Sequence, residues 1–93
     1  MINICIPKVN KECLNKGLIH NAFSRIGLGV IKTITIHGNG CVFVIFSKWF
    51  DTERTRDIQK KLLDGENIYV TYDQEWGWFW KCCMLRSAMA NIN

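Results

Sequence analysis

The sequence GNGCVFVIF (residues 38–46) joins a glycine turn directly to an apolar strand. Asn39 and Gly40 predict a tight hairpin turn, because both residue types tolerate the left-handed backbone that such turns need. The run that follows, residues 41–47, is apolar at consecutive positions, as in strands that are covered on both faces. We therefore expect the second strand of this hairpin to lie in the interior of a sheet.

The rest of the chain shows the spacing of apolar residues that is typical of helices and strands. Strands are expected at residues 3–9, 30–37, 68–72 and 76–84, and helices at residues 10–25 and 51–63. The expected boundary signals are N-caps at Asn10 and at Asp51 or Thr52, helix ends at Gly27 and Gly65, and irregular strand positions at Pro7 and Gly77.

This order of elements predicts an α+β domain with the split β-α-β-β-α-β, or ferredoxin-like, arrangement. We expect a four-stranded antiparallel sheet, an extra strand before the last one, and two amphipathic helices on one face of the sheet. The other face is then left to solvent or to a partner. Residues 1–85 are expected to form a single domain and residues 86–93 a flexible C-terminal tail.

Composition limits the classes of function that the chain can have. Its 93 residues are 48% hydrophobic and carry a formal charge of +4, which is compatible with a polyanionic partner but includes no dense block of Lys and Arg. No apolar run is long enough for a membrane helix, and no secretory signal is recognised. The five cysteines are odd in number and two of them are adjacent, which favours free thiols in a reducing, intracellular compartment.

The strand after the glycine turn resembles the main signature of the RNA recognition motif (RRM), K/R-G-F/Y-G/A-F-V-x-F/Y. Gly40, Phe43, Val44 and Phe46 match it, whereas Asn39, Cys41 and Val42 depart from it. The sequence ICIPKV (residues 4–9) matches the aliphatic positions of the family's first-strand signature, with Cys5 in place of the aromatic residue and Lys8 in place of Asn. The chain therefore resembles a degenerate RRM over nearly its whole length.

A closer resemblance is to short, uncharacterised RRM-like proteins of large nucleocytoplasmic DNA viruses. It is carried by IPKV, by CVFVIFSKWFDTERTRDIQKKLLDGE and by YVTYDQEWGWFWK. This resemblance implies a fold and a viral setting, with the host cytoplasm or nucleus, or the virion, as the expected location. It does not imply an established activity.

The family register implies that one sheet face carries the candidate binding residues, which are Cys5, Cys41, Phe43, Thr33, Thr35 and His37. Typical members stack three aromatic side chains on unpaired bases, and this chain keeps only Phe43. The two losses remove roughly 2–6 kcal/mol of stacking, so any binding of single strands is expected to be weak. Lys81 and Arg86, on or just after the last strand, are candidates for phosphate contacts. The alternative is that Phe43 contacts a protein or the C-terminal tail.

Trp76, Trp78 and Trp80 recur at a spacing of two residues, which predicts that they share one face of the last strand. With Phe79 they form a possible aromatic platform for bases or a hot spot for a protein partner. The alternative, favoured for one or two of the Trp residues, is that they close the core beneath the second helix. A bulge at Gly77 would exchange the two faces.

No constellation in the chain indicates catalysis, a cofactor or a metal. Cys82 and Cys83 point to opposite faces of a strand, and neither C-x₂-C nor H-x₃-H occurs. A zinc site built from Cys5, Cys41 and His37 is conceivable but disfavoured. Two hypotheses follow: a non-catalytic module that binds single-stranded RNA or DNA weakly, or a protein-interaction module, either a viral accessory or virion component or a homo-oligomer.

Overall fold

Five antiparallel strands form one sheet in the order β2-β3-β1-β5-β4. The computed structural model describes residues 2–86. Its elements are β1 (Ile4–Ile6), the 3₁₀ helix η1 (Lys11–Cys13), α1 (Lys16–Ile26), β2 (Gly29–Ile36), β3 (Val42–Trp49), α2 (Glu53–Leu63), β4 (Ile68–Asp73) and β5 (Trp78–Met84). Most of the predicted C-terminal tail, residues 87–93, lies outside the described residues.

The α+β class is confirmed, but the predicted four-stranded sheet is wrong because the sheet has five strands. The segment expected as an extra strand is β4, which pairs with β5 from Ile68 to Asp73 and forms one edge of the sheet. Its alternation of buried Ile68 and Val70 with exposed Tyr69 and Thr71 is that of a strand with one covered face. β3 lies between β2 and β1, as its uninterrupted apolar run predicts.

A single hydrophobic core lies between the sheet and the two helices. Its sheet side is formed by alternate strand residues, among them Ile4, Ile6, Val42, Val44, Val70, Trp80 and Cys82. α1 contributes Ile19, Ala22 and Phe23, whereas α2 contributes only Leu62 as a buried apolar residue. The helix-facing side of the sheet is therefore closed mainly by α1.

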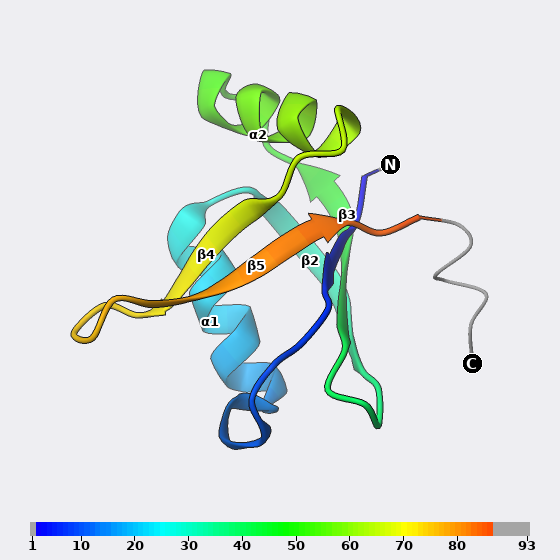
Figure 1. Ribbon diagram of the computed structural model, residues 1–93. Coiled ribbons are helices and arrows are strands. Elements are labelled where there is room, and N and C mark those ends of the chain that lie inside the picture. The colour runs from blue at the N-terminus through cyan, green and yellow to red at the C-terminus, as the bar shows by residue number, and fades with distance from the viewer. Residues whose placement is uncertain (1, 87–93) are drawn as a thin grey trace.

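The sheet curls around α1, which contacts both edge strands, β2 and β4. Figure 1 shows α1 behind β4 and β5, and the β4–β5 hairpin reaching beyond it to one side. The Arg25 guanidinium near the end of α1 donates from Nη2 to the backbone oxygens of Thr71 and Tyr72, at 3.3 Å each. These bonds tie the end of α1 to the edge strand β4 at the position where its pairing with β5 is irregular.

The first helix starts later than the sequence predicts. Asn10 makes no side-chain capping bond, and it precedes the short η1 rather than α1. Asn15 is the cap, since its Oδ1 accepts the backbone N–H of Leu18 at 3.1 Å. The chain turns at Leu14, so α1 is capped by Asn15 and not by Asn10, although both side chains have the same capping chemistry. α1 then ends at Gly27, whose φ of 71° is left-handed, as predicted.

Irregular pairing of β2 with β3 sets the positions of two aromatic side chains. The pairing register of β2 with β3 shifts between Val30 and Thr33. Because of this shift, the side chains of β3 after Phe46 no longer alternate regularly between the two faces of the sheet. Phe46 and Trp49 consequently pack against each other, with ring centroids 4.7 Å apart. Trp49 Nε1 donates to the Ile2 backbone oxygen at 2.7 Å, which ties the end of β3 to the segment that leads into β1.

α2 begins with a reciprocal cap between Thr52 and Thr55. Each backbone N–H donates to the other residue's Oγ1, at 3.0 and 3.1 Å, which satisfies two donors at the start of the helix. Thr55 is 1% exposed, and its hydroxyl donates to the Phe50 backbone oxygen at 2.6 Å. The predicted cap at Thr52 is confirmed, and Thr55 additionally fastens the loop after β3.

Thr55→Val is expected to lower the free energy of unfolding by about 1–3 kcal/mol, because valine keeps the shape and leaves buried backbone groups unpaired. Urea unfolding measures the loss. Thr35→Val, at an exposed position of β2, is the matched control and should stay within about 0.5 kcal/mol of wild type. Equal losses in the two variants would contradict this account of the α2 cap.

Candidate nucleic-acid interface

Strand register defines the face of the sheet that points away from the helices. Thr35 pairs with Phe43, Phe43 with Cys5, and Cys5 with Cys83, so these four residues form one row across β2, β3, β1 and β5. Their strand neighbours Ile4, Val42 and Cys82 are buried in the core on the opposite side. We call the face of this row the outer sheet face. Thr33, which pairs with Ile45, lies on the same face as Thr35.

Phe43 is half-buried at the centre of the outer sheet face. The ring of His37, from the turn after β2, lies against it with a centroid distance of 4.4 Å and an interplanar angle of 57°. His37 is itself half-buried, and its Nε2 has no hydrogen-bond partner. The structure therefore brings these two predicted site residues together and leaves part of the Phe43 ring accessible.

Cys5 forms the floor of the outer sheet face rather than part of its surface. It is 2% exposed, and its Sγ lies 3.7 Å from the Sγ of Cys41. Burial raises the pKa of the Cys5 thiol well above its usual range, and the neighbouring Cys41 and Cys83 thiols add to that effect. Cys5 is thus a neutral thiol beneath the surface, and a ligand would meet Cys41 and Phe43 instead.

An exposed aromatic pair occupies the part of the outer sheet face formed by β4 and β5. Tyr69 is 61% exposed and Phe79 is 56% exposed, and their rings meet edge to face at 5.3 Å. Lys81 is exposed and is the register partner of Tyr69. Sequence reasoning selected Phe79 and Lys81 but missed Tyr69. The signal was present, because Tyr69 stands between two apolar residues in a strand of alternating pattern.

The two aromatic sites are separate. Phe79 lies four residues along β5 from Cys83, and Cys83 lies two strands from Phe43. Standard strand geometry then places Phe43 and Phe79 roughly 16 Å apart. One base cannot contact both rings, so a ligand that uses both sites must be an extended chain.

The three Trp residues do not form the predicted platform. Trp80 is 4% exposed and stacks on Tyr72 in the core at 4.5 Å, whereas Trp78 is 55% exposed on the same, helix-facing side of β5. Trp76 is not in the strand, which is a correction, because residues 74–77 form the turn between β4 and β5. The side chain of Phe79 lies on the outer sheet face, which is the side of β5 opposite to Trp78 and Trp80.

The turn itself explains this correction. Asp73 Oδ1 accepts the backbone N–H groups of Glu75 and Trp76, at 3.1 Å each. Gly77 adopts a φ of 72° and closes the turn. The irregular position predicted at Gly77 therefore belongs to the turn and not to the inside of β5. The register shift lies in β4, between Thr71 and Asp73. The tip of the hairpin is consequently an ordered turn with an exposed Trp.

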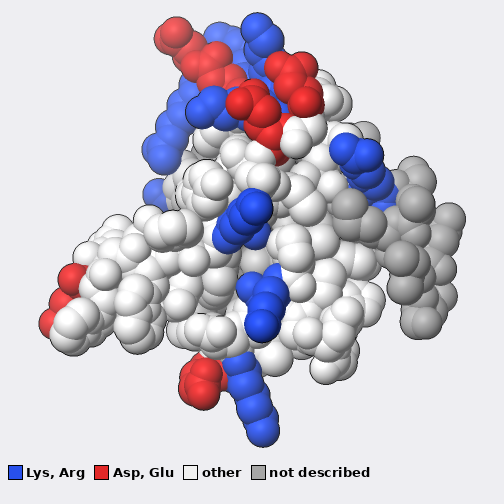
Figure 2. All heavy atoms as spheres, in the orientation of Figure 1, with Lys and Arg blue, Asp and Glu red and all other residues white. Residues whose placement is uncertain are grey.

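Charged side chains are unevenly distributed over the molecule. Figure 2 shows them crowded around α2, whereas the broad face over β4 and β5 is mostly uncharged with isolated basic groups. Lys81 and Arg86 are both exposed, as a contact with phosphate requires. Within residues 2–86 a single ion pair occurs, between Arg56 of α2 and Asp51, which precedes that helix. The outer sheet face therefore carries few charged groups beside its exposed aromatic residues.

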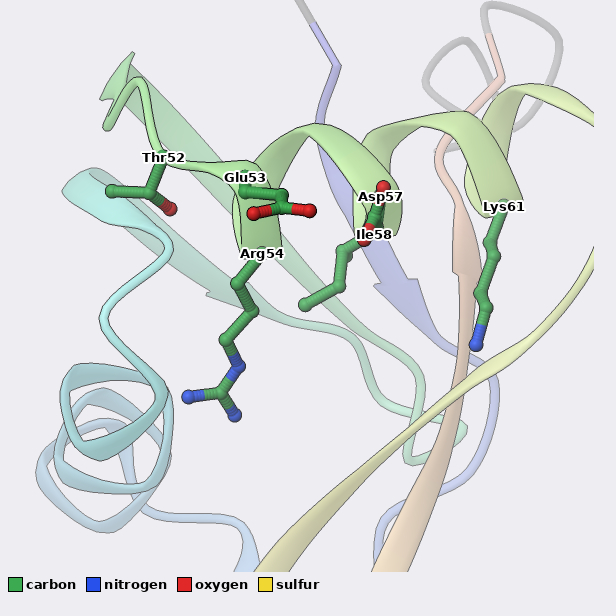
Figure 3. A pocket seen from close by; sticks show the side chains of 6 residues that line it. All are labelled: Thr52, Glu53, Arg54, Asp57, Ile58 and Lys61. Carbon is green, nitrogen blue, oxygen red and sulfur yellow. The ribbon is translucent and has the colours of Figure 1, made fainter.

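A groove of about 610 Å³ along α2 is a different candidate site. Figure 3 shows Arg54 and Lys61 extending to the same side of the helix, with Ile58 between them. Glu53 and Asp57 line the same groove, so its charges balance. The groove therefore offers no net attraction for a polyanion, and its charged residues form an ordinary solvated face of α2.

Comparison with models of known protein families, with curated protein sequences and with solved structures yields no match for this chain. Within residues 2–86, no three His, Cys, Asp or Glu side chains gather as a metal site. Neither helix in this part of the chain has the length and apolarity that a membrane span requires. The resemblance to RRM proteins therefore continues to rest on the residues themselves.

Cys82 and Cys83 test the assignment of the two faces. Burial raises the pKa of the Cys82 thiol to about 12, so its reactive thiolate is scarce at pH 8, whereas Cys83 is partly accessible. Iodoacetamide should alkylate Cys83 much faster than Cys82 in the folded protein. Mass spectrometry of a time course measures both rates, with urea-unfolded protein as the control. Equal rates in the folded protein would contradict the register.

Proposed function

We propose that this chain is an RRM-like, non-catalytic module that binds single-stranded nucleic acid weakly through its outer sheet face. The observation that carries the proposal is the exposed Tyr69–Phe79 pair beside Lys81, on the same face as Phe43. Proteins that bind unpaired bases without strict sequence preference commonly use aromatic rings with a free π-face and nearby basic side chains.

The arrangement of β1 and β3 supports the RRM-like part of the proposal. These two strands carry the segments that resemble the family's signatures, and they pair with each other at the centre of the sheet. The positions at which the family places aromatic residues, Cys5, Cys41 and Phe43, lie together: Cys5 pairs with Phe43 and touches Cys41. The proposal also includes the viral setting that the resemblance to short RRM-like proteins implies.

The outer sheet face also explains why weak binding is expected. Two of the three central aromatic positions are cysteines, and one of these is buried. Tyr69 and Phe79 replace part of the lost stacking, but on the other half of the face, next to a lone lysine. With a base–aromatic stack worth about 1–3 kcal/mol, we expect dissociation constants in the micromolar to millimolar range at low salt.

Phe79→Ala and Tyr69→Ala are each expected to weaken binding of a fluorescein-labelled oligo(dT) or oligo(U) by about 5- to 150-fold, because each variant removes one stacking surface. Fluorescence anisotropy at low salt measures the change. Leu63→Ala removes an equally exposed apolar side chain from α2 and should leave the affinity unchanged. A wild-type protein that gives flat titration curves would refute the proposal.

Lys81→Gln is expected to weaken binding of the same oligomers and to reduce the salt dependence. Loss of one phosphate contact should lower the slope of log K against log salt concentration by about 0.7, the value for single strands. Lys60→Gln, on the exposed surface of α2, makes the same change of charge away from the sheet and should preserve the slope. Identical slopes for wild type and Lys81→Gln would remove Lys81 from the interface.

A second candidate function, interaction with a protein through the hairpin tip, is favoured by a different observation. Trp76 and Trp78 are 69% and 55% exposed, and their rings stack at 6.4 Å. Asp73 and Glu75 lie in the same tip, where they would repel phosphate. Exposed Trp residues are frequent hot spots of protein interfaces, so this surface suits a protein better than a nucleic acid.

A second copy of the chain is the partner that can be tested directly. If the tip mediates self-association, the sedimentation coefficient of the wild-type protein should rise with concentration, and Trp76→Ala should abolish the rise while oligonucleotide binding persists. Leu18→Ala, at an exposed apolar site on α1, provides the control. A wild-type protein that remains monomeric at every concentration would contradict self-association.

A further inference from the structure

Two of the cysteines near the centre of the outer sheet face have thiols in contact, and a third cysteine is a register neighbour. Cys5 lies in β1, with Cys83 of β5 as its register partner on one side. Cys41, which directly precedes β3, approaches Cys5 on the other side, with the two Sγ atoms 3.7 Å apart. All three are free cysteines. Chance burial of a single cysteine is common, but two thiols in contact between β1 and the residue before β3 are a redox-competent arrangement.

Backbone contacts hold Cys41 over Cys5. The Val9 backbone N–H, just after β1, donates to the Gly40 oxygen at 2.9 Å, which ties the hairpin turn to the first strand. Within the turn, the Cys41 N–H donates to Asn39 Oδ1 at 3.0 Å, and the Cys41 oxygen accepts the His37 N–H at 2.9 Å. The proximity of the two thiols is therefore built into the fold and does not depend on a rotamer alone.

We propose that Cys41 and Cys5 are an oxidation site, at which a hydroperoxide converts the two thiols into a disulfide that clamps β1 to the start of β3. The Sγ atoms must close from 3.7 Å to about 2.05 Å. The backbone of Cys41 is already held beside Cys5, so rotation of the two cysteine side chains has to supply the remaining approach. The oxidation does not depend on the proposed binding of nucleic acid.

The two thiols have distinct roles in the reaction. Cys41 is half-exposed and can meet the peroxide, whereas Cys5 is 2% exposed and cannot. The Cys41 thiolate attacks the peroxide, so that an S–O bond forms, the O–O bond breaks, and hydrogen peroxide leaves one water after proton uptake. Cys41 is then a sulfenic acid.

Cys5 resolves this sulfenic acid. Its sulfur attacks the Cys41 sulfur, an S–S bond forms, the S–O bond breaks, and the Cys5 proton leaves with the hydroxide as a second water. Two thiols have then lost two electrons to one hydrogen peroxide, which yields two waters. Because burial raises the pKa of Cys5, this step should be slow enough for dimedone to trap the intermediate on Cys41.

The disulfide should stabilise the fold measurably. It would link residues that are 36 positions apart, and it would restrict the unfolded chain accordingly. For a domain of this size the expected rise in Tm is on the order of 10 °C. Dithiothreitol should reverse the rise, which distinguishes a disulfide from higher oxidation states.

The test is treatment of the full-length chain with hydrogen peroxide, followed by alkylation, peptide mapping and thermal unfolding. We expect a monomer that is 2 Da lighter, a linked Cys5–Cys41 peptide and the higher Tm. Cys83→Ser should behave like wild type, and Cys41→Ser should form no disulfide and show no rise in Tm. Both variants change half-exposed positions, so the buried Cys5 is left in place.

Three results would overturn the proposal. These are an unchanged thiol count after peroxide treatment, a Cys5–Cys83 link in place of Cys5–Cys41, and a disulfide-linked dimer on a non-reducing gel. Failure of oligonucleotide binding alone would count only against the proposed function, because the disulfide is measured independently of it.

Discussion

The pairing register of β1 is the constraint on which the rest of the structure depends. This strand has only three residues, Ile4, Cys5 and Ile6, and all three are buried. It nevertheless joins the two halves of the sheet, since β3 lies on one side of it and β5 on the other. A slip of one residue would move Cys5 into the core and both Ile side chains to the outer face, so burial of the two Ile residues fixes the position of every neighbouring strand.

Fixing β1 also determines what each face can do. On the helix side, the β4–β5 hairpin continues beyond α1 (Figure 1). Trp80 on this side is buried, whereas Trp78, two residues closer to the hairpin tip, is exposed. On the outer face, the thiol cluster sits at the centre and the Tyr69–Phe79 pair lies on the distal half. The two proposed binding functions therefore use opposite faces of the same hairpin, and substitutions can separate them.

Local chemistry made much of the fold predictable. Periodicity identified the five strands and the two α-helices but not η1, and the reciprocal bonds between Thr52 and Thr55 set the start of α2. The prediction failed at Asn10 because a second Asn residue, Asn15, caps the helix instead. It failed at Trp76 because a turn held by Asp73 takes the place of the expected strand. At the candidate site, the family register implied by the resemblance placed Cys5 and Phe43 on one face, and the two residues are register partners. It could not reveal that Cys41 covers Cys5, because that contact depends on the tertiary tie between Val9 and Gly40.

Chemical-shift mapping of the ¹⁵N-labelled chain during titration with a short oligo(dT) tests the central claim most directly, because it reports on each backbone amide separately. The account predicts that the largest shifts occur at Tyr69, Phe79 and Lys81, followed by Phe43, with α1 and α2 nearly unaffected. Shifts confined to the basic residues of α2, such as Arg54 and Lys61, with none on the sheet, would contradict it.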